Sequence, residues 1–286
     1  MADVTTIGTA LARARKALSA VSDSPQLDAH VLLAHVLGVV RATLIAHPER
    51  VLTAEQAAAF DALVARAAGG EPVPYLIGER AFYRHDFSVT PDVLIPRPET
   101  EHLVEATLNL VRRLWPDSQG LALVDVGTGS GAIAVSLAAA LPGVRMIALD
   151  ISPAALAVAR RNAARVGVAL ECYESDLLEG LPADVQPAVI VSNPPYIPTA
   201  ELATLEVAQH EPRLALDGGP DGLAVIRRLV TQAAERLVRP GALLMEIGSG
   251  QGAAVQVLCE SAFSRTDVRV LRDYAGHERV VEVVAE

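Results

Sequence analysis

The sequence predicts an α/β protein in which a mostly parallel sheet, covered by helices on both faces, follows a smaller all-helical domain. Short apolar runs without alternation recur after about residue 97, and helix-like segments separate them. Before that point the periodicity is helical. The length of 286 residues is near the expectation for two domains at about 150 residues each.

The composition narrows the class of protein further. With 51% hydrophobic and 20% charged residues, the chain can bury a sizeable core and does not resemble a disordered protein. Its 24 Lys and Arg against 34 Asp and Glu give a net charge of −10, which argues against a broad grip on nucleic acid phosphates. Cys172 and Cys259 are too few for a disulfide framework or a four-thiolate metal site. We therefore expect a reduced, cytoplasmic protein without a metal site.

Neither a secretory signal nor a membrane span is expected. At the N-terminus Arg13, Arg15 and Lys16 follow the apolar residues, the reverse of a secretory signal. Residues 126–144 carry no charge and have nominal membrane length, but they contain a glycine-rich start and Pro142-Gly143. A strand, a turn and a buried helix explain this stretch better, so we expect a soluble protein.

The first 80 residues predict a helical domain. One helix is expected to begin at Ser24-Pro25 and to end at Gly38, and a second follows the capping-box residues Thr53 and Gln56. Between residues 81 and 95, aromatic and β-branched residues surround Thr90-Pro91-Asp92. This pattern predicts a hairpin connector with its turn at those three residues.

The strands of the sheet are predicted from four short apolar runs, at residues 121–126, 145–150, 187–192 and 242–247. Helices are expected between them, including residues 153–166 and 222–238. Residues 268–273 and 279–284 flank a short polar turn and predict an antiparallel hairpin at the end of the chain.

A glycine loop at residues 127–131 joins the first of these strands to an apolar helix. Glycines allow the sharp turn and let a ligand come close to the helix N-terminus. Asp150 ends the next strand, where a carboxylate can accept hydrogen bonds from both hydroxyls of a ribose. The G-x-G-x-G spacing differs from the G-x-G-x-x-G of dinucleotide binders and favours a nucleoside with a short amino-acid tail.

Two further carboxylates leave alternatives open. Asp125 could hold the amino group of the ligand through water or have a purely structural role. Asp176, beside Leu177, could accept from an adenine amino group or lie in a solvated loop. We interpret Arg227-Arg228 as a solvated helix face.

The turn Asn193-Pro194-Pro195-Tyr196 follows the third apolar run and faces the same crevice, because ligands sit at the carboxyl ends of parallel strands. Two prolines remove two backbone donors and leave carbonyl acceptors beside an aromatic ring. Such acceptors can bind both hydrogens of a planar –NH2 group, with Tyr196 stacked on its plane. They also stabilise positive charge that grows on the nitrogen as it attacks an electrophile.

Together, VDVGTGSG, Asp150 and NPPY resemble the class I, Rossmann-like S-adenosylmethionine-dependent methyltransferases that act on amino groups. The segments IPRPETE (95–101), NPPYIP (193–198) and EPRLALDGGPDGL (211–223) narrow the resemblance to the HemK/PrmC family. That family methylates the glutamine side-chain nitrogen N5 in the GGQ motif of class I peptide chain release factors, which supports translation termination.

The resemblance implies three parts: a helical substrate-docking domain (1–80), a β-hairpin connector (81–96) and a methyltransferase domain (97–286). The implied partner is the GGQ domain of a class I release factor. We also expect a monomer that contacts neither nucleic acid directly nor a membrane. Arg97, Glu99 and Glu101 would shape the substrate entrance or form a structural ion pair. The implied S-adenosylmethionine contacts are Gly127, Thr128, Gly129, Ser130, Gly131, Asp150, Asp176, Leu177 and Asn193, and the implied catalytic and substrate-binding residues are Asn193, Pro194, Pro195 and Tyr196.

One alternative function uses the same turn. An N6-adenine DNA methyltransferase would also hold an exocyclic amine with an NPPY-type turn, but it must flip its base and grip phosphates. The net negative charge of the chain and the lack of a separate basic region argue against this DNA methyltransferase alternative. A non-catalytic module that only binds the nucleoside is a third possibility.

Overall fold

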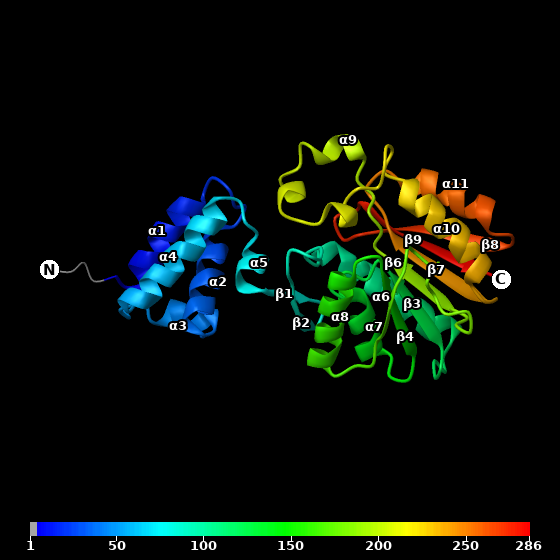
Figure 1. The fold of residues 1–286 in the computed structure, drawn as a ribbon, viewed down its shortest axis with the longest axis horizontal. Helices are drawn as coiled ribbons and strands as arrows, with labels where there is room; N and C mark the ends of the chain where they lie inside the picture. Colours follow the sequence, from blue (N-terminus) through cyan, green and yellow to red (C-terminus); the bar gives the residue numbers. More distant parts are fainter. Residues whose placement is uncertain (1–4) are drawn as a thin grey trace. The chain divides into compact units, whose positions relative to one another are not determined.

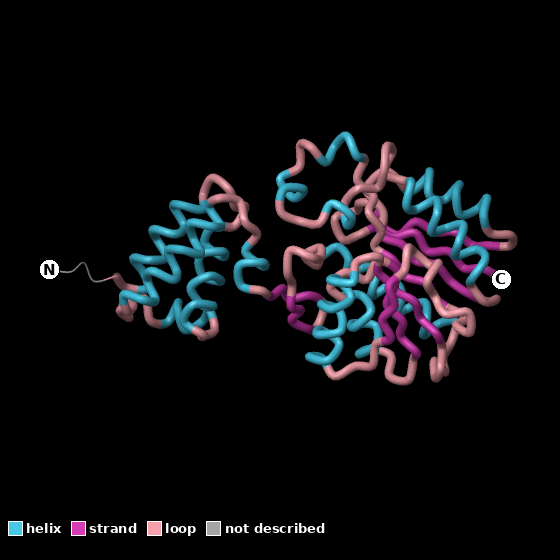
Figure 2. The backbone as a smooth tube through the Cα atoms, viewed as in Figure 1, coloured by secondary structure: helices cyan, strands magenta, loops and turns pink. Residues whose placement is uncertain are grey.

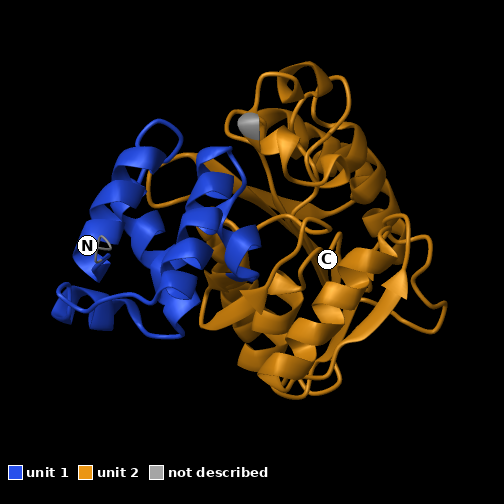
Figure 3. Cartoon of the chain, turned by 60° about the vertical axis from the view of Figure 1, so that its left-hand side comes forward, with its two compact units in different colours: residues 1–79 blue, residues 80–286 orange. Residues whose placement is uncertain are grey.

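The computed structural model describes residues 5–286, apart from the side chain of Glu206. The chain forms two compact units, residues 1–79 and 80–286 (Figure 3).

The first unit is helical, as its periodicity predicts. The second helix begins directly after Ser24 and ends at Gly38, whose φ of 63° is the left-handed conformation that favours glycine. Thr53 and Gln56 cap the fourth helix reciprocally, which confirms the predicted capping box. The helices are α1 (Ile7–Leu18), α2 (Pro25–Leu37), α3 (Arg41–Ala46), α4 (Ala54–Ala68) and α5 (Val73–Ile77), packed around buried residues such as Ile7, Leu32, Leu33 and Phe60.

A β-hairpin follows, but its turn lies elsewhere than the sequence predicts. Strands β1 (Glu79–Phe82) and β2 (His85–Ser88) pair across a two-residue turn at Tyr83-Arg84, with φ of 54° at Tyr83. Thr90-Pro91-Asp92 do form a turn, in which Val93 N donates to Thr90 O at 3.1 Å, but this turn lies in the loop beyond β2, so the prediction that it closes the hairpin is wrong. The side chain of Asn162 holds the end of the hairpin: its Oδ1 accepts from Ser88 N at 2.8 Å and its Nδ2 donates to Ser88 O at 3.0 Å.

The second unit contains a seven-stranded sheet in the order β5-β4-β3-β6-β7-β9-β8 (Figure 1). The first five strands in this order are parallel, whereas β9 runs antiparallel to both β7 and β8. This arrangement confirms the predicted mostly parallel sheet with a terminal antiparallel pair. The strands are β3 (Ala122–Val126), β4 (Arg145–Asp150), β5 (Glu171–Glu174), β6 (Val189–Ser192), β7 (Gly241–Glu246), β8 (Thr266–Arg272) and β9 (Glu278–Ala285).

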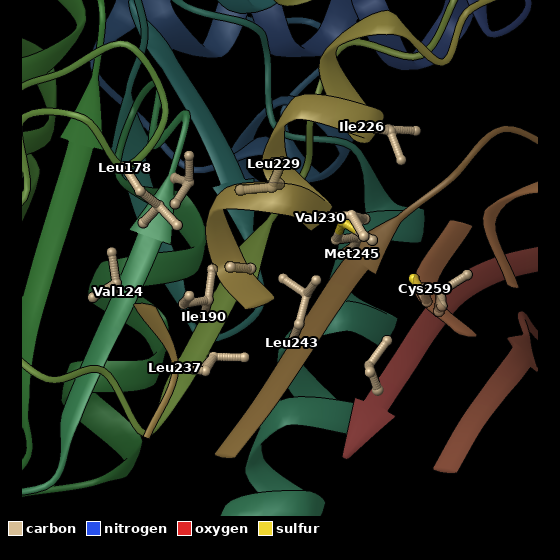
Figure 4. Packing of buried hydrophobic residues seen from close by; sticks show 14 of the residues in the cluster. Val124, Leu178, Ile190, Ile226, Leu229, Val230, Leu237, Leu243, Met245 and Cys259 are labelled. Atoms are coloured by element: carbon tan, nitrogen blue, oxygen red, sulfur yellow. The ribbon is translucent and has the colours of Figure 1, made fainter. Parts of the chain in front are cut away.

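Helices cover both faces of this sheet. Successive strand residues point to opposite faces, so Leu123 packs with one group of helices and Val124 with the other. The helices on the Leu123 side are α6 (Glu101–Leu114), α7 (Ala132–Ala140) and α8 (Pro153–Val166), and those on the Val124 side are α10 (Ala224–Arg236) and α11 (Gly252–Ala262). Figure 4 shows the Val124 side, where Leu229 and Val230 of α10 pack against the strand residues.

Between β6 and α10 the chain runs mainly as loop, with short helical turns (Figure 2). These turns are α9 (Thr199–Leu202), η2 (Glu206–Gln209) and η3 (Arg213–Ala215), and a similar turn, η1 (Pro98–Thr100), precedes α6. The uncharged stretch 126–144 is the end of β3, a turn and α7, as predicted. Within the described part of the chain, no helix combines the length and apolar character needed to cross a bilayer.

Candidate functional site

A cavity of about 600 Å³ lies in the second unit, at the carboxyl ends of β3, β4 and β6. Its volume is within the range of small-molecule sites, and its position is where an open parallel sheet binds ligands. Its walls include the glycine loop, the turns after β4 and β5, Asn193 and Pro195, residues 212–215, and parts of segment 92–100.

The glycine loop leaves room for a ligand close to its backbone. Gly129 has a φ of 55°, lines the cavity, and would place a Cβ with no atom within 4 Å. Gly131 has a different environment: with φ of 80°, its Cβ would lie 3.1 Å from Cα of Ala159. The structure therefore places Gly127, Thr128, Gly129 and Ser130 in the cavity wall, while Gly131 packs against α8.

Asp125 stabilises the conformation of the glycine loop. Its side chain is fully buried, and its Oδ2 accepts from Thr128 Oγ1 at 2.7 Å and from Ala134 N at 3.2 Å. Burial raises the pKa of Asp125 to about 7, against the effect of these hydrogen bonds. Its Oδ1 has no hydrogen-bond partner among the described residues. The sequence left open whether Asp125 binds the ligand or has a structural role, and these contacts support the structural role.

Asp150 lines the cavity with part of its hydrogen-bonding capacity free. Its Oδ2 accepts from Gly129 N at 2.8 Å and its Oδ1 from Ser152 N at 2.9 Å. A carboxylate has about four acceptor positions, so each oxygen can take one further donor. Burial raises the pKa of Asp150, and the backbone hydrogen bonds oppose that effect. This arrangement suits the two hydroxyls of a ribose.

The turn after β5 brings Asp176 and Leu177 to the same cavity. Leu177 has a φ of 53°, unusual for a residue with a side chain, and the Ser175 hydroxyl donates to its carbonyl oxygen at 2.7 Å. Arg228 Nη2 donates to Asp176 Oδ2 at 2.8 Å.

Arg228 is therefore more than the solvated helix residue that we predicted. It lines the cavity and pairs with Asp176, while its neighbour Arg227 pairs with Asp221. A basic residue on α10 gives no sequence signal for this partner, because 52 residues separate Arg228 from Asp176.

The Asn-Pro-Pro-Tyr turn lies at the end of β6, as predicted. Asn193 and Pro195 line the cavity, and Asn193 Nδ2 donates to Thr100 Oγ1 at 3.1 Å. Pro194 is buried, and the hydroxyl of Tyr196 donates to Glu246 Oε1 at 3.2 Å. Burial raises the pKa of Tyr196, as does the nearby Glu246 charge. Neither Pro194 nor Tyr196 is among the residues that line the cavity.

The segment 211–223 packs directly on this turn. Ile197 N donates to Leu216 O at 3.1 Å, and Gly218 N donates to Ile197 O at 2.8 Å. Gly222 has a φ of 74°, and a Cβ there would lie 2.4 Å from the carbonyl oxygen of Tyr196. Segments 193–198 and 211–223, which are separate motifs in the sequence, thus pack together at the cavity.

Of the entrance residues, Arg97 both lines the cavity and forms an ion pair. Its Nη2 lies 2.5 Å from Oε1 of the buried Glu211, whose Oε2 accepts from Ile95 N at 3.0 Å. Glu101 accepts from Tyr83 N at 2.9 Å, and Glu99 is exposed.

A second cavity, of about 630 Å³, lies within the first unit and is more open to solvent. Leu27 and Ile45 line it and are 45% and 70% exposed, beside His30 and Arg41. Among the side chains that the structure describes, no group of three or more His, Cys, Asp or Glu is placed to hold a metal ion.

Comparisons with known proteins cover both units. Residues 9–78 match a family model described as PrmC N-terminal domain, and residues 100–211 match one described as methyltransferase small domain. The chain is 46% identical to a release factor glutamine methyltransferase of Moorella thermoacetica, over 96% of each chain. It is 45% identical to a protein of the same name from Bordetella pertussis, over 90% of this chain and 93% of that one.

Two solved structures share the fold of the second unit. One is the hMettl16 catalytic domain in complex with a MAT2A 3′UTR hairpin, with a TM-score of 0.54 and 15% identity over 70% of this chain and 74% of that one. The other is the Thermus thermophilus 16S rRNA N2 G1207 methyltransferase in complex with AdoMet and guanosine, with a TM-score of 0.50 and 20% identity over 73% of this chain and 49% of that one.

Proposed function

This chain belongs to the release factor glutamine methyltransferase family, and we propose that it methylates the side-chain nitrogen N5 of the glutamine in the GGQ motif of class I peptide chain release factors. Family membership confirms the predicted resemblance, and the second unit has the predicted class I methyltransferase fold. The observation that carries the proposed activity is that Asn193 and the glycine loop line one cavity.

The chain is an S-adenosylmethionine-dependent enzyme, and its cavity fits that cofactor. The open space above Gly129 admits a ligand, and Asp150 keeps an acceptor position on each oxygen for a ribose. We assign the adenine end to Asp176 and Leu177, which meet the cavity from the turn after β5. When bound, the cofactor supplies an electrophilic methyl group on a sulfonium.

We assign recognition of the glutamine amide to the Asn-Pro-Pro-Tyr turn. Because Asn193 Nδ2 donates to Thr100, the Oδ1 atom of Asn193 is the part of this side chain that accepts from the substrate. A backbone carbonyl of Pro194 or Pro195 would accept the second N–H. Fixed acceptors stabilise the positive charge that grows on the amide nitrogen during attack.

The methylated nitrogen then returns to a neutral amide by losing one N–H proton to water. Stacking of Tyr196 on the amide plane stays a prediction, since its hydroxyl is directed to Glu246 and only Asn193 and Pro195 of the turn line the cavity.

The proposed substrate implies a role for each part of the chain and the compartment in which the enzyme works. We propose that residues 1–80 dock the release factor, that residues 81–96 connect, and that residues 97–286 methylate. We also propose a monomer that works in the cytoplasm, where release factors act, without binding nucleic acid. The net charge of −10 supports the last point.

The discriminating experiment gives the purified protein labelled S-adenosylmethionine together with either a class I release factor or DNA. We expect label on the release factor, at the GGQ glutamine, and none on DNA. Label on DNA alone would support the N6-adenine alternative and end the proposal, whereas cofactor binding without transfer to either would indicate the non-catalytic module.

A further inference from the structure

Behind Asn193, polar side chains from separate elements form a connected network. Asn193 Nδ2 donates to Thr100 Oγ1 at 3.1 Å, and Thr100 Oγ1 donates to Glu246 Oε2 at 2.6 Å. The second carboxylate oxygen, Oε1, accepts from the Tyr196 hydroxyl at 3.2 Å. Thr100 ends η1 and is 5% exposed, while Glu246 ends β7 and is 1% exposed. One carboxylate therefore connects to the first and last residues of the Asn-Pro-Pro-Tyr turn.

The network has a direction. An ionised carboxylate only accepts hydrogen bonds, so the Thr100 hydroxyl must direct its hydrogen at Glu246. The Thr100 oxygen is then an acceptor toward Asn193, and only the amide NH2 can satisfy it. With the amide rotated by half a turn, two acceptor oxygens would face each other in a buried site, which is costly. The network thus selects one of two orientations of Asn193 that have nearly the same shape.

Several charges act on Glu246. Burial raises its pKa, and the Thr100 hydrogen bond, the positive charge of Arg279 and the Tyr196 hydrogen bond each oppose that rise, while the Glu99 charge adds to it. Arg279, on β9, is itself held by Asp273 at 3.2 Å. The net effect on Glu246 is a raised pKa, set by burial, while the guanidinium and the two hydroxyl donors act in the opposite sense and favour the ionised carboxylate from which the direction of the network is derived.

We propose that Thr100 and Glu246 are positioning residues, which turn the carbonyl oxygen of Asn193 toward the substrate amide. Thr100 lines the cavity, but its hydroxyl is engaged by Glu246 and Asn193, so both residues act on the substrate through Asn193. This inference rests on the proposed function, since it assumes that an amide is the group Asn193 receives.

Thr100 provides the test because it can lose its hydroxyl with little change of shape. T100V is expected to lower kcat about tenfold or more, because Asn193 is no longer held in the accepting orientation, while the Kd for S-adenosylhomocysteine stays within about twofold. T100S keeps the hydroxyl and is expected to restore kcat to within about threefold of the parent.

A matched control lies in α6. Thr107 is also buried, and its hydroxyl donates to Leu103 O at 2.7 Å, away from the cavity. T107V removes a buried hydroxyl in the same way and is expected to lower thermal stability but to keep kcat per folded enzyme. Folded sites are counted by S-adenosylhomocysteine titration, and initial rates are measured with an intact release factor.

The outcomes separate two failures. A parent enzyme that does not methylate the release factor overturns the proposed function and the inference with it. An active parent for which T100V, T100S and T107V all share its kcat overturns the inference alone, as does a loss of kcat in T107V equal to that in T100V. If T100V does not fold, T100A compared with T100S makes the same comparison.

Discussion

At the scale of single residues, buried carboxylates of this protein organise the cavity walls through the donors they accept. Asp125 accepts from Thr128 and from a helix amide, and Glu211 accepts from Arg97 and Ile95 N. Asp150 accepts from two backbone amides and still faces the cavity. Each of these groups fixes a loop in a conformation that leaves ligand-facing atoms exposed.

Asn193→Ala tests the assigned role of the turn. The variant loses the acceptor for the substrate N–H, so turnover is expected to fall by about 10²–10³-fold, as when one oriented transition-state contact is removed. The measurement is transfer of labelled methyl to a release factor at saturating cofactor. Turnover close to that of the parent enzyme would contradict the role given to Asn193.

Asp125→Asn tests the cost of a buried carboxylate. The folded pKa of about 7 lies above the ordinary value of 3.8, so between these pH values the folded protein binds more protons than the unfolded one. The free energy of unfolding is therefore expected to fall as the pH rises through this window, by about 1.4 kcal/mol for each unit of pKa difference. The amide that replaces the carboxyl group does not titrate, so the variant lacks this contribution.

The measurement is urea unfolding of both proteins without ligand, at several pH values across that window. The variant should gain stability relative to the parent as the pH rises. Since Asp150 and Glu246 titrate in both proteins, their effects cancel to first order in the difference. A difference in stability that is constant across the window would show that Asp125 keeps an ordinary pKa.

Part of the site could be predicted from residues alone. Asn193, Asp150 and the glycine loop each follow a strand, and the carboxyl ends of parallel strands meet at one edge. Thr100 lies in the IPRPETE segment, but its pairing with Glu246 could not be predicted, because the contact spans 146 residues and Glu246 belongs to no recognisable pattern. Only folding reveals which polar side chain lies behind a binding residue.

At the scale of elements, the glycine loop performs two separate tasks. Gly129→Ala adds a methyl group in open space but at a positive φ, which costs about 1–2 kcal/mol, and the methyl enters the cavity. We expect weaker binding of S-adenosylhomocysteine with a modest loss of stability. Gly131→Ala meets the backbone of α8 at 3.1 Å, so we expect a larger loss of stability.

Calorimetric binding and thermal unfolding of the two variants check this contrast. Equal losses of stability, together with equal losses of affinity, would contradict the division of tasks between the two glycines.

Sequence patterns predict best the strands that are buried on both faces and the helices that have a clear start signal. Strand β4 and helix α8 have the predicted bounds, since apolar runs and a Ser152-Pro153 start define them. The edge strand β5 was not predicted, because it pairs only with β4 and carries Glu171 and Glu174. The hairpin turn was misplaced because Tyr83-Arg84 lacks the Gly, Asn or Asp that usually marks such a turn.

At the scale of the whole molecule, the proposed docking of the release factor on the first unit can be tested at an exposed apolar residue of that unit. Ile45 is 70% exposed beside the second cavity, and an apolar side chain of this kind in an open groove suits a protein partner. Ile45→Asp is expected to raise the KM for an intact release factor several-fold, with little change in kcat or in cofactor affinity.

Val21→Asp is the matched control, because Val21 is 46% exposed in the same unit but does not line that cavity. Steady-state kinetics with the intact factor compare the two variants. Equal KM values for both would place docking on another surface.

We propose that a pocket of fixed carbonyl acceptors presents a glutamine amide nitrogen to the methyl donor. Mass spectrometry tests this directly, on an intact class I release factor incubated with S-adenosylmethionine and either the parent enzyme or Asn193→Ala. We expect one added methyl group, on the side-chain nitrogen of the GGQ glutamine, with the parent enzyme and almost none with the variant. An unmodified glutamine with the parent enzyme, or a methyl group on another residue, would contradict it.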